Sequence, residues 1–146
     1  MTALFEHSPW VEERADARPS SGDRHADLMA VVQEAEIADQ LALIRAHPEL
    51  AGKAAVNRAL TQASASEQAS AGLDRLTPEE FDEFHALNAA YRARFDFPFI
   101  ICVRLTDKAG ILAAMRARLK NDREQEIATA LAQIGEIVRL RLEDLK

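Results

Sequence analysis

Apolar residues recur along most of this chain with the three- and four-residue spacing of an α-helix, and alternating apolar and polar runs are scarce. The clearest example is residues 77–95. Thr77 suits the N-cap of a helix, Pro78 its first position and Glu80 its third. The helical stripe that follows consists of Phe81, Phe84, Asn88, Tyr91 and Phe95.

Weaker signals predict further helices on both sides of this segment. One helical face near the start of the chain carries four apolar residues, Leu28, Val31, Val32 and Ala35. Further along, Pro48 disfavours helical geometry at His47 and so predicts a helix end there. In chain order, the pattern predicts helical structure around 28–35, a short helix at 40–46, a helix from Thr106 or Asp107 through Leu119, and a final helix from about Asp122 to Leu145.

The remaining segments are expected to be irregular. Residues 14–24 are rich in Pro, Ser and Gly and predict an exposed loop, while 51–62 fits either a surface loop or one ragged helix. Residues 97–103, FPFIICV, predict a short extended apolar segment, because Phe97 precedes a proline. The expected fold is all-α: one compact helical domain over residues 1–146, with a single extended apolar segment at 97–103.

Composition narrows the function. The 146 residues carry 18 Lys and Arg against 24 Asp and Glu, so the net charge of −6 argues against nucleic acid as a partner. One cysteine excludes an internal disulfide and a cysteine-rich metal site, and the four histidines form no HxH or HxxxH pair, so no metal is expected. No apolar run is long enough for a membrane span and the N-terminal residues lack the basic-then-apolar order of a signal peptide, which predicts a cytoplasmic protein.

One charged residue interrupts the apolar seam of the final helix. The seam runs Ile127, Leu131, Ile134, Val138, Arg141 and Leu145, so Arg141 occupies a position where burial is expected. A buried guanidinium must meet an anion or carbonyl groups. The alternative is that Arg141 reaches solvent from a frayed helix end and caps the last carbonyls.

Two further polar residues have both a structural and a functional interpretation. In Ser64-Ala65-Ser66-Glu67, the glutamate completes a possible capping box, or it is a carboxylate beside Gln68 that binds a polar ligand. His47 precedes Pro48 at a helix-to-loop break, so it is either an ordinary histidine at a helix end or a group that exchanges protons near neutral pH.

The simplest interpretation of the extended segment is a stretch of chain that crosses the core. Its buried backbone N–H and C=O groups then need partners, and a planar polar ligand is one possible source. Cys102 within it has no basic neighbour in sequence, so it is interpreted as a packing residue rather than a nucleophile.

Taken in order, FEHSPW, HPEL, SxxEQ, AGLDRL, NAAYRARFDFPFIICV and RLRLEDL resemble the 2-oxo-4-hydroxy-4-carboxy-5-ureidoimidazoline (OHCU) decarboxylases of purine breakdown. The resemblance extends from Phe5 to Leu145. It implies an all-helical, homodimeric and cofactor-free enzyme that converts OHCU to (S)-allantoin and carbon dioxide. It also implies an additional N-terminal helix, before FEHSPW, for which this chain has only Met1 to Leu4.

The resemblance assigns roles to the residues singled out above. His47 would be the catalytic acid or base, with Glu67 and Arg141 beside it in the active site, and Arg141 would bind the anionic side of the substrate. The implied substrate-binding residues are Pro48, Ser64, Glu67, Gln68, Phe99, Ile100, Ile101, Cys102, Val103 and Arg141. A non-catalytic helical interaction domain or a ureide-binding protein that keeps the family core is the alternative. An interaction domain would not require His47, Glu67 and Arg141 to converge.

Overall fold

The computed structural model describes residues 4–5, 8–47, 66–69, 71–73 and 75–145. All regular structure in these residues is helical, which confirms the predicted all-α class. In chain order the elements are α1 (Trp10–Asp16), α2 (Arg24–Glu34), α3 (Ile37–Ala46), α6 (Pro78–Phe95), the short 3₁₀-helix η1 (Val103–Leu105), α7 (Lys108–Arg118) and α8 (Arg123–Asp144).

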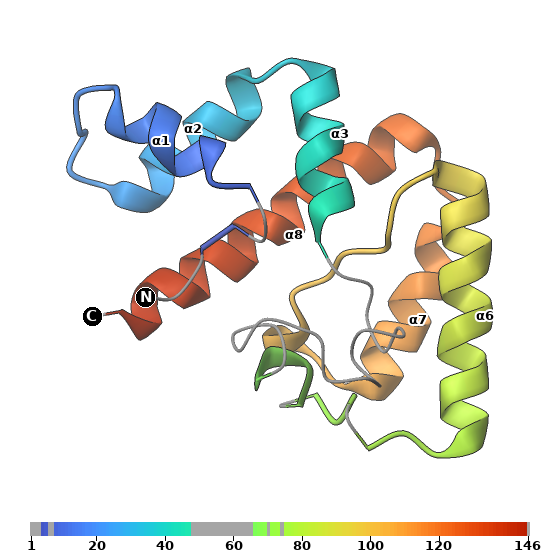
Figure 1. The fold of residues 1–146 in the computed structure, drawn as a ribbon. Coiled ribbons are helices and arrows are strands. Elements are labelled where there is room, and N and C mark those ends of the chain that lie inside the picture. Colours follow the sequence, from blue (N-terminus) through green and yellow to red (C-terminus); the bar gives the residue numbers. More distant parts are fainter. Residues whose placement is uncertain (1–3, 6–7, 48–65, 70, 74, 146) are drawn as a thin grey trace.

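The longest of these, α8, is the helix on which the others are arranged (Figure 1). Helices α2 and α3 pack directly on it, α1 packs on α2, and α6 pairs with α7. The buried residues of α8 cover a wide face: Glu126, Ile127, Ala130, Ile134, Gly135, Ile137, Val138 and Arg141. Of the predicted seam, Ile127, Ile134, Val138 and Arg141 are therefore buried, whereas Leu145 lies past the helix and is 54% exposed.

Helix boundaries follow the capping residues that the sequence contains. Thr77 accepts a hydrogen bond from the backbone N–H of Glu80, whose side chain accepts from the N–H of Thr77, so the start of α6 is a complete capping box. Asp107 caps α7 and Asp122 caps α8. These starts confirm the predictions, and Asp107 is the cap rather than Thr106.

Three boundaries differ from the prediction. Helix α2 begins at Arg24, the last residue of the predicted loop 14–24 and four residues before the predicted 28. The other end of that loop was also wrong, because Arg14 to Asp16 belong to α1. This helix has no side-chain cap and is only 7 residues long, so it lacks a clear local signal. It is stabilised by packing, since Val11 and Ala15 are buried and the Arg14 guanidinium lies 4.5 Å from the centre of the Trp10 ring. Helix α3 also begins three residues before the predicted 40, at Ile37.

The extended apolar segment at 97–103 is present and crosses the core between α6 and η1 (Figure 1). Phe97, Phe99, Ile100, Cys102 and Val103 are all buried, and Val103 begins η1. The predicted alternatives for 51–62 lie outside the described residues.

Candidate active site

His47 is held at the C-terminal end of α3. Its backbone is extended (φ −75°, ψ 139°), as the proline after it predicts, and its N–H donates to the carbonyl of Ile44. Two residues earlier, Arg45 donates to the backbone carbonyl and the carboxylate of Asp96, at 3.1 and 2.9 Å, which ties this end of α3 to the end of α6. His47 lies at a helix end, as predicted, but it is only 6% exposed and is therefore not a surface residue.

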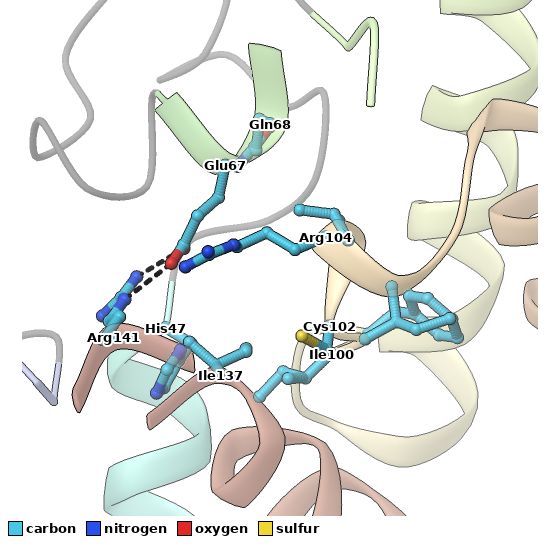
Figure 2. Close-up of a pocket in the computed structure, with 11 residues that line it drawn as sticks. His47, Glu67, Gln68, Ile100, Cys102, Arg104, Ile137 and Arg141 are labelled. Atoms are coloured by element: carbon cyan, nitrogen blue, oxygen red, sulfur yellow. Dashed lines mark hydrogen bonds and ion pairs between the residues drawn. The ribbon is translucent and has the colours of Figure 1, made fainter. Parts of the chain in front are cut away.

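Arg141 and Glu67 form a bidentate ion pair inside the molecule (Figure 2). Arg141 Nε lies 2.8 Å from Glu67 Oε2, and its Nη2 lies 2.7 Å from Oε1. A third nitrogen, Nη1, donates to the carbonyl of Leu4 at 3.3 Å. Arg141 is 2% exposed, so the alternative in which it reaches solvent is wrong, and the anion predicted opposite it is present within the chain.

Burial of the Glu67–Arg141 ion pair carries a desolvation cost. Two charges removed from water are compensated only when geometry is good and their remaining hydrogen-bonding atoms are satisfied, and removing either partner leaves an uncompensated charge. The pair therefore fixes the 66–69 turn of helix, which carries Glu67 and Gln68, against the last turns of α8.

The extended segment forms one wall of the site, and side chains of α7 and α8 form hydrogen bonds with its backbone. Arg118 of α7 donates to the carbonyl of Ile100 at 2.6 Å, and the N–H of Cys102 donates to the side chain of Gln133 at 2.8 Å. These side chains, rather than a ligand, satisfy two of the buried polar groups that the sequence left without partners. Burial raises the pKa of the Cys102 thiol, which keeps it protonated at neutral pH and agrees with a packing role.

A cavity of about 430 Å³ of atom-free space, open to solvent, lies between these parts (Figure 2). It is lined by His47, Glu67, Gln68, Phe99, Ile100, Ile101, Cys102, Val103, Arg104, Ile137 and Arg141. Nine of these residues are among the predicted site residues. The two other predicted residues, Pro48 and Ser64, lie outside the described residues.

Two lining residues were not predicted from the sequence. Ile137 lies one helical turn before Arg141 on α8, so the seam spacing could have indicated it. Arg104 directly follows the extended segment, in η1, and its guanidinium is held by Asp144 at the end of α8, with N–O distances of 2.7 and 3.1 Å. Nothing in the local sequence connects these two residues, which are 40 positions apart.

The site thus combines a buried histidine, a carboxylate, two guanidinium groups and an apolar wall. Such a set can bind a polar anion and transfer a proton to or from it. Among the described residues, no group of three or more His, Cys, Asp or Glu side chains is arranged to hold a metal ion. None of the described helices is long and apolar enough to cross a bilayer.

Comparison with known proteins gives one consistent match. The family model described as OHCU decarboxylase matches residues 1–143. The uric acid degradation bifunctional protein PucL of Bacillus subtilis is 41% identical over 98% of this chain, which spans 29% of that protein. The 2-oxo-4-hydroxy-4-carboxy-5-ureidoimidazoline decarboxylase of Haloferax volcanii is 40% identical over 95% of this chain and 82% of its own length.

Two solved structures have the same fold. The crystal structure of (S)-allantoin synthase aligns with a TM-score of 0.71 and 30% identity, covering 97% of this chain and 46% of that one. The crystal structure of OHCU decarboxylase in the presence of (S)-allantoin aligns with a TM-score of 0.74 over 97% of this chain and 94% of the other; at 20% identity this second likeness concerns the fold alone.

Proposed function

The chain belongs to the OHCU decarboxylase family, and we propose that it removes the carboxylate of OHCU as carbon dioxide and releases (S)-allantoin in urate breakdown. The observation that carries this proposal is the convergence of His47, the Glu67–Arg141 pair and the 99–103 wall on one cavity (Figure 2). These groups come from four separate segments of the chain, and a domain used only for protein contacts has no need to gather them around a cavity.

One C–C bond breaks, and a C–H bond forms on the neighbouring carbon. The bond to the carboxylate breaks, carbon dioxide leaves, and the electron pair is accepted by the adjacent imine, whose nitrogen takes up a proton. The carbon that held the carboxylate becomes a carbonyl as its hydroxyl group loses its proton, and a proton adds to the former imine carbon, which carries the ureido group and becomes the stereocentre of allantoin. Because the substrate accepts these electrons itself, the proposal involves no cofactor.

His47 is proposed to handle this proton. It lies at the cavity and is almost fully buried, so a proton held on its ring would reach only the face of the carbon turned toward it. Delivery to one face yields a single enantiomer, the S form, whereas spontaneous decay yields both.

Glu67 is proposed to orient the hydroxyl and ureido groups of the substrate. Its two carboxylate oxygens are each bonded to Arg141, which fixes the direction of its remaining lone pairs. Arg141 in turn supplies positive charge at the anionic side of the substrate. Gln68 and the wall residues Phe99, Ile100, Ile101, Cys102 and Val103 are proposed to complete the substrate-binding surface.

Circular dichroism tests the reaction directly. OHCU is generated in place by enzymatic oxidation and hydrolysis of urate, and the appearance of the (S)-allantoin signal is followed with and without the protein. Rapid appearance of that signal supports the proposal. Decay at the spontaneous rate to racemic product, from folded protein, would favour the alternative of a ureide-binding or interaction domain.

Substitution of His47 tests whether this residue transfers the proton. His47→Ala is expected to remove the acceleration while leaving the far-ultraviolet spectrum unchanged. His85→Ala is a matched control, because His85 lies on the exposed face of α6, away from the cavity. Full activity in His47→Ala would show that another group moves the proton.

The family resemblance also leads us to propose that the protein acts as a cytoplasmic homodimer. Light scattering on the purified protein tests the assembly: twice the chain mass of 16.2 kDa is expected, and a single chain mass would contradict it.

A further inference from the structure

Two arginines line the cavity, and they are held in different ways. Arg141 is 2% exposed and is bound to a carboxylate whose side chain is 12% exposed. Arg104 is held by Asp144, and those two side chains are 30% and 55% exposed. Breaking a buried pair is strongly unfavourable, whereas an exposed pair contributes little to stability. Of the two guanidinium groups, that of Arg104 is therefore the easier to transfer to another carboxylate.

The position of Asp144 further weakens its ability to compete with another carboxylate for the Arg104 guanidinium. It is the last residue of α8, and the C-terminal end of a helix carries partial negative charge that disfavours a carboxylate. The hydrogen bond from Arg104 lowers the pKa of the Asp144 carboxyl, so this group is ionised at neutral pH. The Asp144 carboxylate is thus an anion bound to the Arg104 guanidinium, and a second anion can replace it.

Arg104 is directed toward the reacting part of the cavity. Its side chain extends from η1 toward the Glu67 carboxylate (Figure 2). The hydrogen bond to Asp144 is the main cause that raises the pKa of Arg104, and the nearby charge of Glu67 raises it to a smaller degree. An anion bound by Arg104 would therefore lie beside the Glu67–Arg141 pair.

We propose that Arg104 binds the carboxylate of the substrate directly, and that Asp144 occupies Arg104 when no substrate is present. This inference rests on the proposed function, in which that carboxylate is the group lost as carbon dioxide. Once it has left, the product carries no anion for Arg104, and Asp144 takes its place again. The exchange distinguishes substrate from product at the cavity.

A weak and exposed ion pair between Arg104 and the substrate carboxylate suits a reaction in which that carboxylate is lost. The charge of the carboxylate disperses as carbon dioxide forms, so an ion pair made only with the ground state slows the chemical step. Arg104 should therefore contribute to binding and little to the rate of bond cleavage, which separates its role from that of His47.

Two variants are expected to change the KM for OHCU in opposite directions. Arg104→Gln should raise it about tenfold or more, since a charge-assisted hydrogen bond is lost, with kcat kept or slightly increased. Asp144→Asn should lower it about two- to fivefold, because the competing anion is removed. Inhibition by (S)-allantoin, which lacks the carboxylate, should change in neither variant.

Arg139→Gln is the matched control, because Arg139 of α8 is also an arginine in an exposed ion pair, with Glu136, but does not line the cavity. Its KM should equal that of the wild type. An unchanged KM in Arg104→Gln, or an equal weakening of OHCU and (S)-allantoin, would overturn the inference, since the second result indicates a general distortion of the pocket. Wild-type activity is measured alongside, so a failure of the proposed function is recognised separately.

Discussion

A buried network behind the cavity wall makes a quantitative prediction about stability. Glu126 is fully buried, and its carboxylate accepts hydrogen bonds from Arg118 at 2.8 Å, from the Tyr91 hydroxyl at 2.6 Å and from Asn121 at 2.8 Å. The Arg118 guanidinium also donates to the carbonyl of Ile100 and lies 4.3 Å from the centre of the Phe99 ring. Arg118 is thus the counter-charge of Glu126 and the support of the wall.

Arg118→Met keeps much of the side-chain volume and removes the charge. Glu126 then remains as a buried carboxylate without a cation, which is expected to lower the free energy of unfolding by about 3–5 kcal/mol. The entropy of unfolding of a 146-residue chain is about 0.3 kcal/mol per kelvin, so Tm should fall by about 10–16 °C. Urea unfolding and calorimetry measure the two quantities.

Arg116→Met is the control for this substitution. Arg116 lies on the same helix and pairs with Glu83, but the two side chains are 55% and 42% exposed, so the loss should stay below about 1 kcal/mol. The double variant Arg118→Met with Glu126→Leu removes both charges and should be more stable than Arg118→Met alone. If Arg118→Met is no worse than Arg116→Met, or if the double variant is the less stable, the argument from the buried charge is wrong.

Two further predictions follow from shifted pKa values. Because burial raises the pKa of the Cys102 thiol, an aromatic disulfide reagent should modify native protein about tenfold or more slowly than urea-unfolded protein; equal rates would contradict this. The N–H of Thr77, and secondarily Lys108, lower the pKa of Glu80 from its usual 4.5. Glu80→Gln should therefore be less stable than wild type at about pH 7, and the difference should shrink as pH falls below about 4.5 toward the folded-state pKa. Glu79→Gln, beside it and exposed, should show a smaller pH dependence in the same urea titration.

Much of the helical structure was determined locally and could be predicted. The starts of α6, α7 and α8 depend on Thr77, Asp107 and Asp122, whose side chains bond to backbone N–H groups three residues ahead. Such contacts are encoded within one turn of the chain. Helix α1 has no such cap and is stabilised by packing on α2, so its residues 14–16 were wrongly assigned to a loop.

The sequence by itself also indicated the residues that we propose to carry the chemistry. Arg141 was conspicuous because it interrupts an apolar seam, and His47 because a proline follows it at a helix end. Only the tertiary structure decided what these residues contact. Glu67, the partner of Arg141, lies 74 positions away, and Asp144, the partner of Arg104, lies 40 away. Pairings at such distances depend on how the 66–69 turn, η1 and α8 pack together, which no local spacing of residues specifies.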